Sequence, residues 1–289
     1  MFFIILISVA VGVGLKHVKE SSQEVQKSAL MIQTNLILED ILKILKSSKE
    51  LEQIDSAEDL FRFLSENSFK ELESSGVKVI LNLKSAGSRF NVNALSESNN
   101  SVNVQRVNLL KDFLNRRSIN GSLADILLDM MSGYRDDMSY NSNIFDTKPT
   151  LFRDRITSRE HLNEALQYYS ATYHDDLTKK MDIENLFYYD RDKNSSIDLN
   201  YATDEVWELI LSCDRAKAKE LKEHKGVYTK LQDLELDEKQ MSNLSSFRTT
   251  FFGTRLSVAV DIVQNEHDAK VRFEYDLKTK KATDFVYEI

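Results

Sequence analysis

LSVAVDIV (Leu256–Val263), AKVRFEY (Ala269–Tyr275) and TDFVYEI (Thr283–Ile289) close the chain and decide its fold class. Apolar and polar residues alternate along all three segments, as they do in strands that bury one face. Short polar turns join the segments, which predicts an antiparallel meander. A sheet of this kind buries its apolar face on a helix, so the rest of the chain has to supply one.

The N-terminal segment is the candidate for that helix. Met1–Leu15 (MFFIILISVAVGVGL) carries no charge, and apolar residues then recur at helical spacing from Val25 to Leu45. As a helix the uncharged run spans about 22 Å, against roughly 30 Å for the hydrocarbon core of a bilayer. A secretory signal peptide needs a basic start, which is absent here, and a buried core helix would not need to be apolar on every face. We predict one long helix over residues 1–45, first a membrane anchor and then an amphipathic stalk.

The middle of the chain is mainly helical. Eight glycines and one proline are few for a large β-sandwich, which needs many tight turns. Strands are predicted over residues 77–83 and 90–95, and helices over residues 55–64, 107–114, 123–131, 159–169, 204–211 and 215–225. The predicted fold class is α+β, with a pilin-like long N-terminal helix packed on an antiparallel sheet. Residues 46–105 form the first α/β part, residues 106–185 a mainly helical insertion domain, and residues 186–289 the second α/β part with the C-terminal meander.

Local signals mark several element ends. Ser56 and Thr157 are each followed three residues later by an acid, which is capping-box spacing. Thr203 is the expected N-cap of the helix that starts at residue 204, and Gly226 is placed as a C′ glycine. Ile197–Asn200 resembles Phe90–Asn93, and we expect each to be a short strand whose Asn caps the following turn.

Composition argues against several function classes. The formal net charge of −8 opposes non-specific binding to nucleic acid, which needs clustered Lys and Arg. Cys213 is the single cysteine, so neither an intrachain disulfide nor a Cys-based metal site is expected. We interpret it as a small buried hydrophobe. The connection Ser212-Cys213-Asp214 lacks the glycines of a helix-hairpin-helix DNA module, and no phosphate loop or nucleophile elbow occurs. We expect no enzyme and no direct contact with nucleic acid.

One acidic loop has the ligand pattern of a calcium site. Its candidate ligands are Asp190, Asp192, Asn194, Ser196 and Asp198. Oxygen-bearing side chains recur at alternate positions, as in the first nine positions of an EF-hand loop. Ser195 replaces the sixth-position glycine, and Tyr201 replaces the twelfth-position acid. We favour the alternative of a solvated acidic turn that leads into a strand. Asp136 and Asp137 form a second, weaker candidate for calcium.

The order of these elements is similar to that of a known family. An apolar N-terminal helix, strands, a helical insertion and a C-terminal antiparallel sheet resemble the minor pseudopilins of type II secretion. The match is to the K class, which carries a large helical insert in a pilin fold. The segments that carry the resemblance are FNVNAL at 90–95, YRDD at 134–137, LFRDRITSREHL at 151–162, IDLNYATDEVWELI at 197–210 and RAKAKELKEHKGVYTKLQDL at 215–234. The resemblance covers nearly the whole chain, and it rests on the order of the segments.

The resemblance implies a non-enzymatic role in assembly. The apolar helix of such a protein lies in the bacterial inner membrane, below a periplasmic head, until the subunit is extracted into a pseudopilus. There the helix packs against the helices of partner subunits. A K-class subunit caps the tip with I- and J-class partners, because its insert obstructs a further subunit. This machinery drives protein secretion or, in competence systems, DNA uptake, and K-class heads can bind calcium.

Two features of the first residues depart from the family pattern. Pseudopilins begin with a basic leader and a glycine at which a prepilin peptidase cuts, and this sequence shows no such site. Ile5 stands where most pseudopilins have a Glu, as is typical of the K class. Lys16, His17 and Lys19 would favour a cytoplasmic C-terminal side, which a basic leader upstream would reverse. The alternatives are a membrane-anchored receptor that contacts DNA during uptake, and a tethered periplasmic sensor or scaffold.

Overall fold

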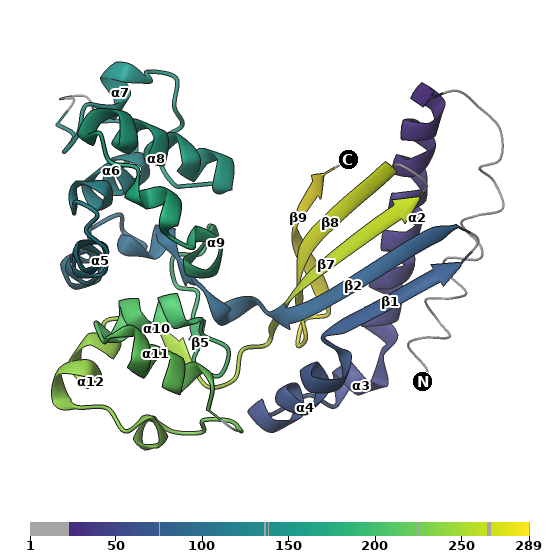
Figure 1. Cartoon of the computed structure of the whole chain (residues 1–289). Helices are drawn as coiled ribbons and strands as arrows, with labels where there is room; N and C mark the ends of the chain where they lie inside the picture. Colours follow the sequence, from purple (N-terminus) through teal and green to yellow (C-terminus); the bar gives the residue numbers. More distant parts are fainter. Residues whose placement is uncertain are drawn as a thin grey trace. The chain divides into compact units, whose positions relative to one another are not determined.

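The computed structural model describes residues 23–288 except 75, 136, 138, 225, 265 and 266. The chain forms two compact units (Figure 1): Met1–Ala86 with Phe252–Ile289, and Gly87–Phe251. The predicted anchor over residues 1–15 and the basic residues that follow it lie outside the described residues. In the part of the chain that is described, no helix combines the length and apolar character needed to cross a bilayer.

The first unit is built on a five-stranded antiparallel sheet. Its strands, in spatial order, are β1 (Phe69–Ser74), β2 (Val77–Ser85), β7 (Arg255–Gln264), β8 (His267–Asp276) and β9 (Lys281–Glu288). The three C-terminal segments form the predicted meander, and the predicted strand over residues 77–83 is β2. β2 and β7 are neighbours, paired from Val77 with Gln264 to Ser85 with Leu256. The hairpin partner β1 was not predicted.

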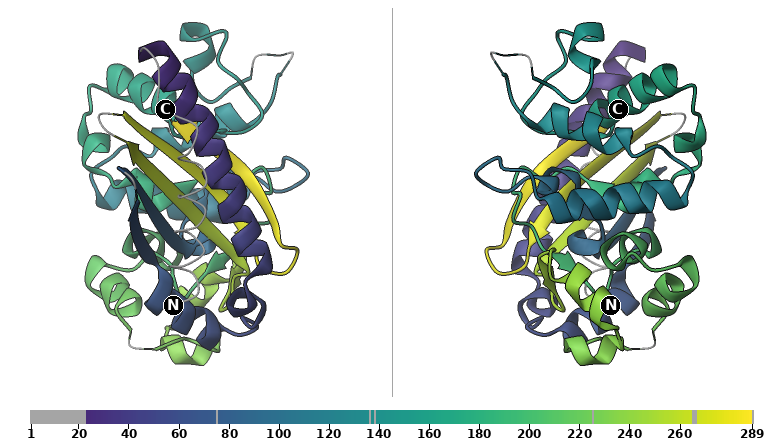
Figure 2. Two further views of the ribbon diagram at one scale, coloured as in Figure 1. Left: turned by 90° about the vertical axis from the view of Figure 1, so that its right-hand side faces the viewer. Right: turned by 90° about the vertical axis from the view of Figure 1, so that its left-hand side faces the viewer.

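One face of this sheet is apolar and fully buried. Alternate residues of the central strands, among them Leu81, Val258 and Val271, are no more than 1% exposed. The helix α2 (Gln23–Ser47) crosses this face (Figure 2) and turns Leu30, Ile37 and other apolar residues inward. The α+β prediction of a long N-terminal helix on an antiparallel sheet is therefore confirmed. Two short helices, α3 (Lys49–Glu52) and α4 (Ala57–Asn67), lead from α2 to β1.

The second unit is mainly helical. Its helices are α5 (Val104–Arg116), α6 (Ser122–Met131), α7 (Ile144–Thr147), α8 (Arg159–Tyr173), α9 (Ile183–Leu186), α10 (Asp204–Leu211), α11 (Arg215–Lys222) and α12 (Glu238–Leu244). Short 3₁₀ turns are η2 (Ala86–Ser88) at the boundary, η3 (Val92–Leu95), η4 (Leu177–Lys180) and η5 (Leu231–Leu234). Two parallel pairs, β3 (Phe90–Asn91) with β4 (Phe187–Tyr188) and β5 (Ile197–Asp198) with β6 (Thr249–Thr250), complete it. Trp207, Phe113 and Tyr169 are fully buried in its core.

The second unit is wider than the predicted insertion. It spans residues 87–251, where the sequence suggested 106–185. The segments on either side were assigned to the two α/β parts, where the sequence predicted short strands. In the structure these segments form β3, β4, β5 and β6, which pair with one another and not with the five-stranded sheet.

Helix ends follow the predicted chemistry at two of four positions. The side chains of Ser56 and Thr203 accept backbone hydrogen bonds as N-caps of α4 and α10. At α8 the N-cap is Ser158, one residue after the predicted Thr157, because the oxygen of Ser158 accepts the first-turn amide. α11 ends at Lys222, so Gly226 (φ +105°) lies in the following turn and not at C′.

Candidate functional site

The carboxylates of the predicted calcium loop close turns of their own backbone. Oδ1 of Asp190 accepts the amide of Asp192, and Oδ1 of Asp192 accepts the amide of Asn194, both at 2.9 Å. Oδ1 of Asp198 accepts the amide of Asn200 at 3.1 Å. Asp192 and Asn194 are exposed, whereas Asp198 is fully buried. These contacts are those of Asx turns, which need no metal.

A buried amide holds the loop from the inside. Nδ2 of Asn91 donates to the carbonyl oxygens of Asp190 and Asp192, at 3.1 and 2.9 Å, and to Oγ of Ser195 at 3.2 Å. A donor nitrogen thus lies among three oxygens, in a position that a cation would favour on charge grounds. On the outer side, Nδ2 of Asn194 donates to Oγ of Ser98 at 2.8 Å.

The remaining candidate ligands do not form a second centre. Ser196 is half-buried. Asp136 lies outside the described residues, and Oδ1 of Asp137 accepts the amide and hydroxyl of Ser139, which lowers the pKa of Asp137. Within the described residues no three His, Cys, Asp or Glu side chains come together in a way that could hold a metal ion. The calcium site stays a prediction of the sequence.

The two similar Asn segments share one hydrogen-bond pattern. In each, the side chain two residues before the Asn accepts its amide at 3.1 Å, so Asn91 and Asp198 cap the turns, and the prediction that Asn93 and Asn200 do so is wrong. Asn93 then clamps the backbone of Ile156, accepting from N and donating to O at 2.8 Å each. Asn200 does the same to Tyr228, at 2.6 and 3.0 Å, and also donates to the carbonyl of Phe251. The clamps tie each short strand to a distant segment of the unit.

α2 exposes apolar side chains on the side away from the sheet. Met31, Ile32 and Leu36 are exposed, Ile32 to 63%. Ile32 and Leu36 are four residues apart, so they lie on one side of the helix. Further along α2 the exposed positions are polar, as at Glu39 and Lys43. This apolar stripe, defined as Met31, Ile32 and Leu36, is a candidate contact for another helix.

The two edge strands of the sheet differ in character. β1 carries charged residues at three of its six positions, Lys70, Glu71 and Glu73, which is a common protection of sheet edges. β9 exposes three consecutive apolar residues, Phe285, Val286 and Tyr287. Phe285 stacks on Phe273 of β8, with ring centroids 5.2 Å apart. β9 is therefore the less protected of the two edges.

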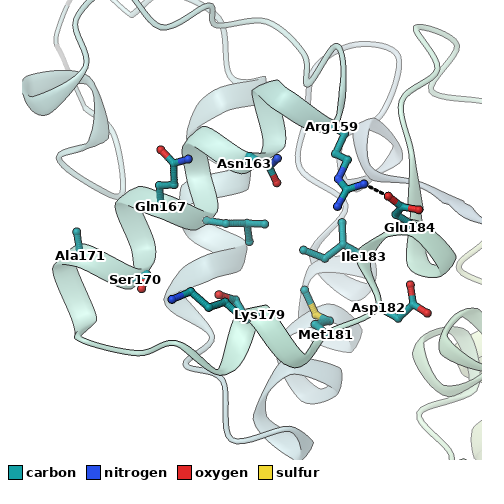
Figure 3. Close-up of a pocket in the computed structure, with 12 residues that line it drawn as sticks. Arg159, Asn163, Gln167, Ser170, Ala171, Lys179, Met181, Asp182, Ile183 and Glu184 are labelled. Carbon is teal, nitrogen blue, oxygen red and sulfur yellow. Dashed lines mark ion pairs between the residues drawn. The ribbon is translucent and has the colours of Figure 1, made fainter. Parts of the chain in front are cut away.

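The second unit contains a cavity of about 650 Å³ (Figure 3). One wall is the side of α8 that carries Leu166 and Gln167. Met181 and Ile183, from the segment that leads into α9, lie across the cavity from α8. An ion pair between Arg159 and Glu184 joins the two walls at one end. The lining mixes apolar and polar groups, and it includes none of the predicted calcium ligands.

Two of the three lysines of α11 have acidic partners. Nζ of Lys217 pairs with Glu220 at 3.2 Å, and Nζ of Lys222 pairs with Asp204 at 2.7 Å. Neutralised cations of this kind contribute little to phosphate binding. Cys213, between α10 and α11, is buried, and burial raises the pKa of its thiol to about 11. A thiol with so high a pKa is a poor nucleophile at neutral pH.

Comparison with solved structures gives a match over both units. A chain in the crystal structure of the GspK–GspI–GspJ complex, from the type 2 secretion system of enterotoxigenic Escherichia coli, superimposes with a TM-score of 0.64. The match covers 91% of this chain and 99% of that chain, at 12% sequence identity. The chain has the fold of a GspK-like minor pseudopilin. No protein-family model and no curated protein sequence matches it, so this pseudopilin fold is detected through structure.

Proposed function

We propose that this chain is a minor pseudopilin of a type II secretion-like system, and that it acts without catalysis at the tip of the pseudopilus. The observation that carries the proposal is the structural match, which extends over 91% of the chain and therefore includes the sheet unit and the helical insertion. A shared sheet alone would support a pilin fold, whereas the insertion is the part that distinguishes the K class. The similar chain was crystallised with GspI and GspJ, and we propose partners of those two classes for this protein.

The apolar stripe of α2 supports this assignment. Met31, Ile32 and Leu36 project from a helix whose opposite face is already buried on the sheet. A single exposed leucine needs no explanation, but three apolar side chains within two turns favour a helical partner. We propose that this stripe continues the contact that the segment before residue 23 makes with partner helices. In this proposal the same segment anchors the protein in the bacterial inner membrane, with the two units in the periplasm.

Co-purification tests the proposal. The full chain, extracted in detergent, should form a stable complex with the I- and J-class minor pseudopilins encoded in the same genome. Ile32→Glu places a charge in the apolar stripe and should abolish or strongly weaken the complex. Lys46→Glu is the matched control, since Lys46 is also exposed on α2 but lies in its last turn, beyond the apolar stripe, and it should retain the complex. A folded wild-type chain that captures neither partner would refute the proposal.

A further inference from the structure

Two acids at the start of α10 are buried. Asp204 and Glu205 occupy the first turn, after the N-cap Thr203, and each is only 7% exposed. Acids in a first turn normally face solvent and interact with the helix dipole. Buried carboxylates are found only where partners compensate for the lost water. The contacts of these two residues are therefore unusual for their position.

The two carboxylates have unequal partners. Asp204 accepts from Nζ of Lys222 at 2.7 Å, and the guanidinium of Arg215 lies 3.9 Å away. Glu205 has an oxygen, Oε2, that is buried and has no hydrogen-bond partner among the described residues. An ionised carboxylate with an oxygen in that environment is strongly disfavoured.

The charges that face Glu205 are negative. Asp204 neighbours it on α10, and Asp182, the N-cap of α9, acts on it from the adjacent helix. Two cations of the packed helices are already engaged: Lys222 of α11 pairs with Asp204, and Arg117, next to α5, pairs with Glu208 at 2.8 Å. From α12, the neutral amide of Asn243 donates to the carbonyl oxygen of Leu211, at the other end of α10. Burial first, and then the neighbouring Asp204 and Asp182, raise the pKa of Glu205 above its ordinary 4.5.

α9 is attached to this acidic junction. Oγ1 of Thr203 donates to the carbonyl of Asn185 at 2.7 Å, and Asp182 caps α9 by accepting the amide of Asn185 at 3.1 Å. Ile183 and Glu184 of α9 line the cavity against α8. A negative charge on Glu205 would repel Asp182, the residue that starts α9.

We propose that Glu205 carries a proton in the folded unit and donates it in a hydrogen bond to Asp204, and that loss of this proton loosens α9 from α10. As the pH rises, the proton passes from Glu205 to solvent, and no other reactant is needed. Below pH 4.5 the folded and unfolded chains are both protonated at this site. Above that pH the unfolded chain ionises first, so unfolding becomes progressively easier until the folded Glu205 ionises too. This proton switch is independent of pseudopilus assembly.

Urea unfolding of the full chain between about pH 5 and about pH 8 tests the switch. The chain has one tryptophan, Trp207 on α10, so its fluorescence reports on this unit alone. Glu205→Gln mimics the protonated form at every pH. The measured quantity is the unfolding equilibrium constant of the wild type divided by that of Glu205→Gln. This ratio should increase as the pH rises, and its total increase should be about tenfold for each pH unit by which the pKa of Glu205 in the folded chain exceeds that in the unfolded chain. Glu223→Gln, which changes an exposed acid at the end of the neighbouring α11, is the control and should keep the wild-type pH profile.

Hydrogen exchange of α9 gives the second readout. After correction for the intrinsic rate at each pH, the amides of residues 183–186 should lose protection in the wild type as the pH rises, while Glu205→Gln keeps it. The strands β7 and β8 serve as the internal reference, because they belong to the other unit. Parallel pH profiles for the wild type and Glu205→Gln in both measurements would overturn the proposal. A profile that flattens in Glu205→Gln alone would support it.

Discussion

The amide clamp of Asn93 should dominate the stability of the second unit. Asn93→Ala removes the acceptor of the Ile156 amide and the donor to the Ile156 carbonyl, each bonded at 2.8 Å, together with a bond to the carbonyl oxygen of Asp190 at 3.1 Å. Both residues are fully buried, so water cannot replace the lost bonds. A buried backbone group left without a partner costs about 1–3 kcal/mol, and two such groups cost about 4 kcal/mol together.

The related clamp at Asn200 provides an internal comparison. Asn200→Ala removes the same pair of bonds to Tyr228, at 2.6 and 3.0 Å, together with the bond to the carbonyl oxygen of Phe251. Asn200 is only half-buried, so in Asn200→Ala water can replace part of the lost hydrogen bonds to the backbone. The expected loss in the free energy of unfolding is about 1–2 kcal/mol. Asn163→Ala, on the cavity wall of α8, is the control for removing an amide and should change stability by less than about 0.5 kcal/mol.

Urea denaturation followed by the fluorescence of Trp207 measures all three variants in the same unit. The expected order of destabilisation is Asn93→Ala, then Asn200→Ala, then Asn163→Ala. The reasoning fails if Asn93→Ala lies within about 1 kcal/mol of the wild type, or if it is less destabilising than Asn200→Ala. Either result would mean that the backbone of Ile156 finds other partners once the side chain is removed.

Four further measurements test other parts of the structure. Leu81→Ala in the centre of β2 should cost about 2–5 kcal/mol, seen as a lower urea midpoint of the sheet unit by circular dichroism. Arg117→Ala should cost about 3 kcal/mol, because it leaves the buried carboxylate of Glu208 without its partner at 2.8 Å, and replacing Glu208 with Gln in the same chain should recover part of the loss. Calorimetric titration with calcium should give no binding heat if the loop is the favoured acidic turn held by Asn91, whereas a site that Asp192→Asn weakens would identify it as a calcium loop. The thiol of Cys213 should react with a disulfide reagent only upon unfolding, and fast labelling of the native chain would contradict its burial and its pKa of about 11.

The sequence predicts best where a period extends over many residues. The alternation in β7, β8 and β9 and the helical spacing that continues to Leu45 in α2 were each strong enough to identify the sheet and the helix on it. The strand β1 was not predicted because a charged edge strand buries no alternate residues, so its sequence lacks the apolar–polar alternation. The insertion boundaries were misplaced because strands of two residues have no period, so their pairing partners cannot be read locally.

The side-chain contacts of the candidate site also could not be predicted fully from local sequence patterns. The spacing of Asp190, Asp192 and Asp198 indicates an acidic turn that leads into a strand, but it does not reveal that Asn91 occupies the centre of the loop from a position far away in the sequence. Thr157 and Ser158 satisfy the same capping rule, and only the geometry selects Ser158. No local sequence pattern indicates that Glu205 is buried, because acidic residues are common in the first turn of a helix and are normally exposed there.

The pairing of β2 with β7 determines how the insertion is tolerated. Ser85 and Leu256 face each other across the ladder, so residues 87–251 leave and re-enter the sheet at positions that a tight turn could also connect. In topological terms the whole second unit stands in for a hairpin loop. The entropy of closing a loop grows only with the logarithm of its length, and the inserted unit is itself folded, so the added chain costs the sheet little. Such an attachment allows the insertion to be exchanged or enlarged while the strand order and register of the sheet are preserved.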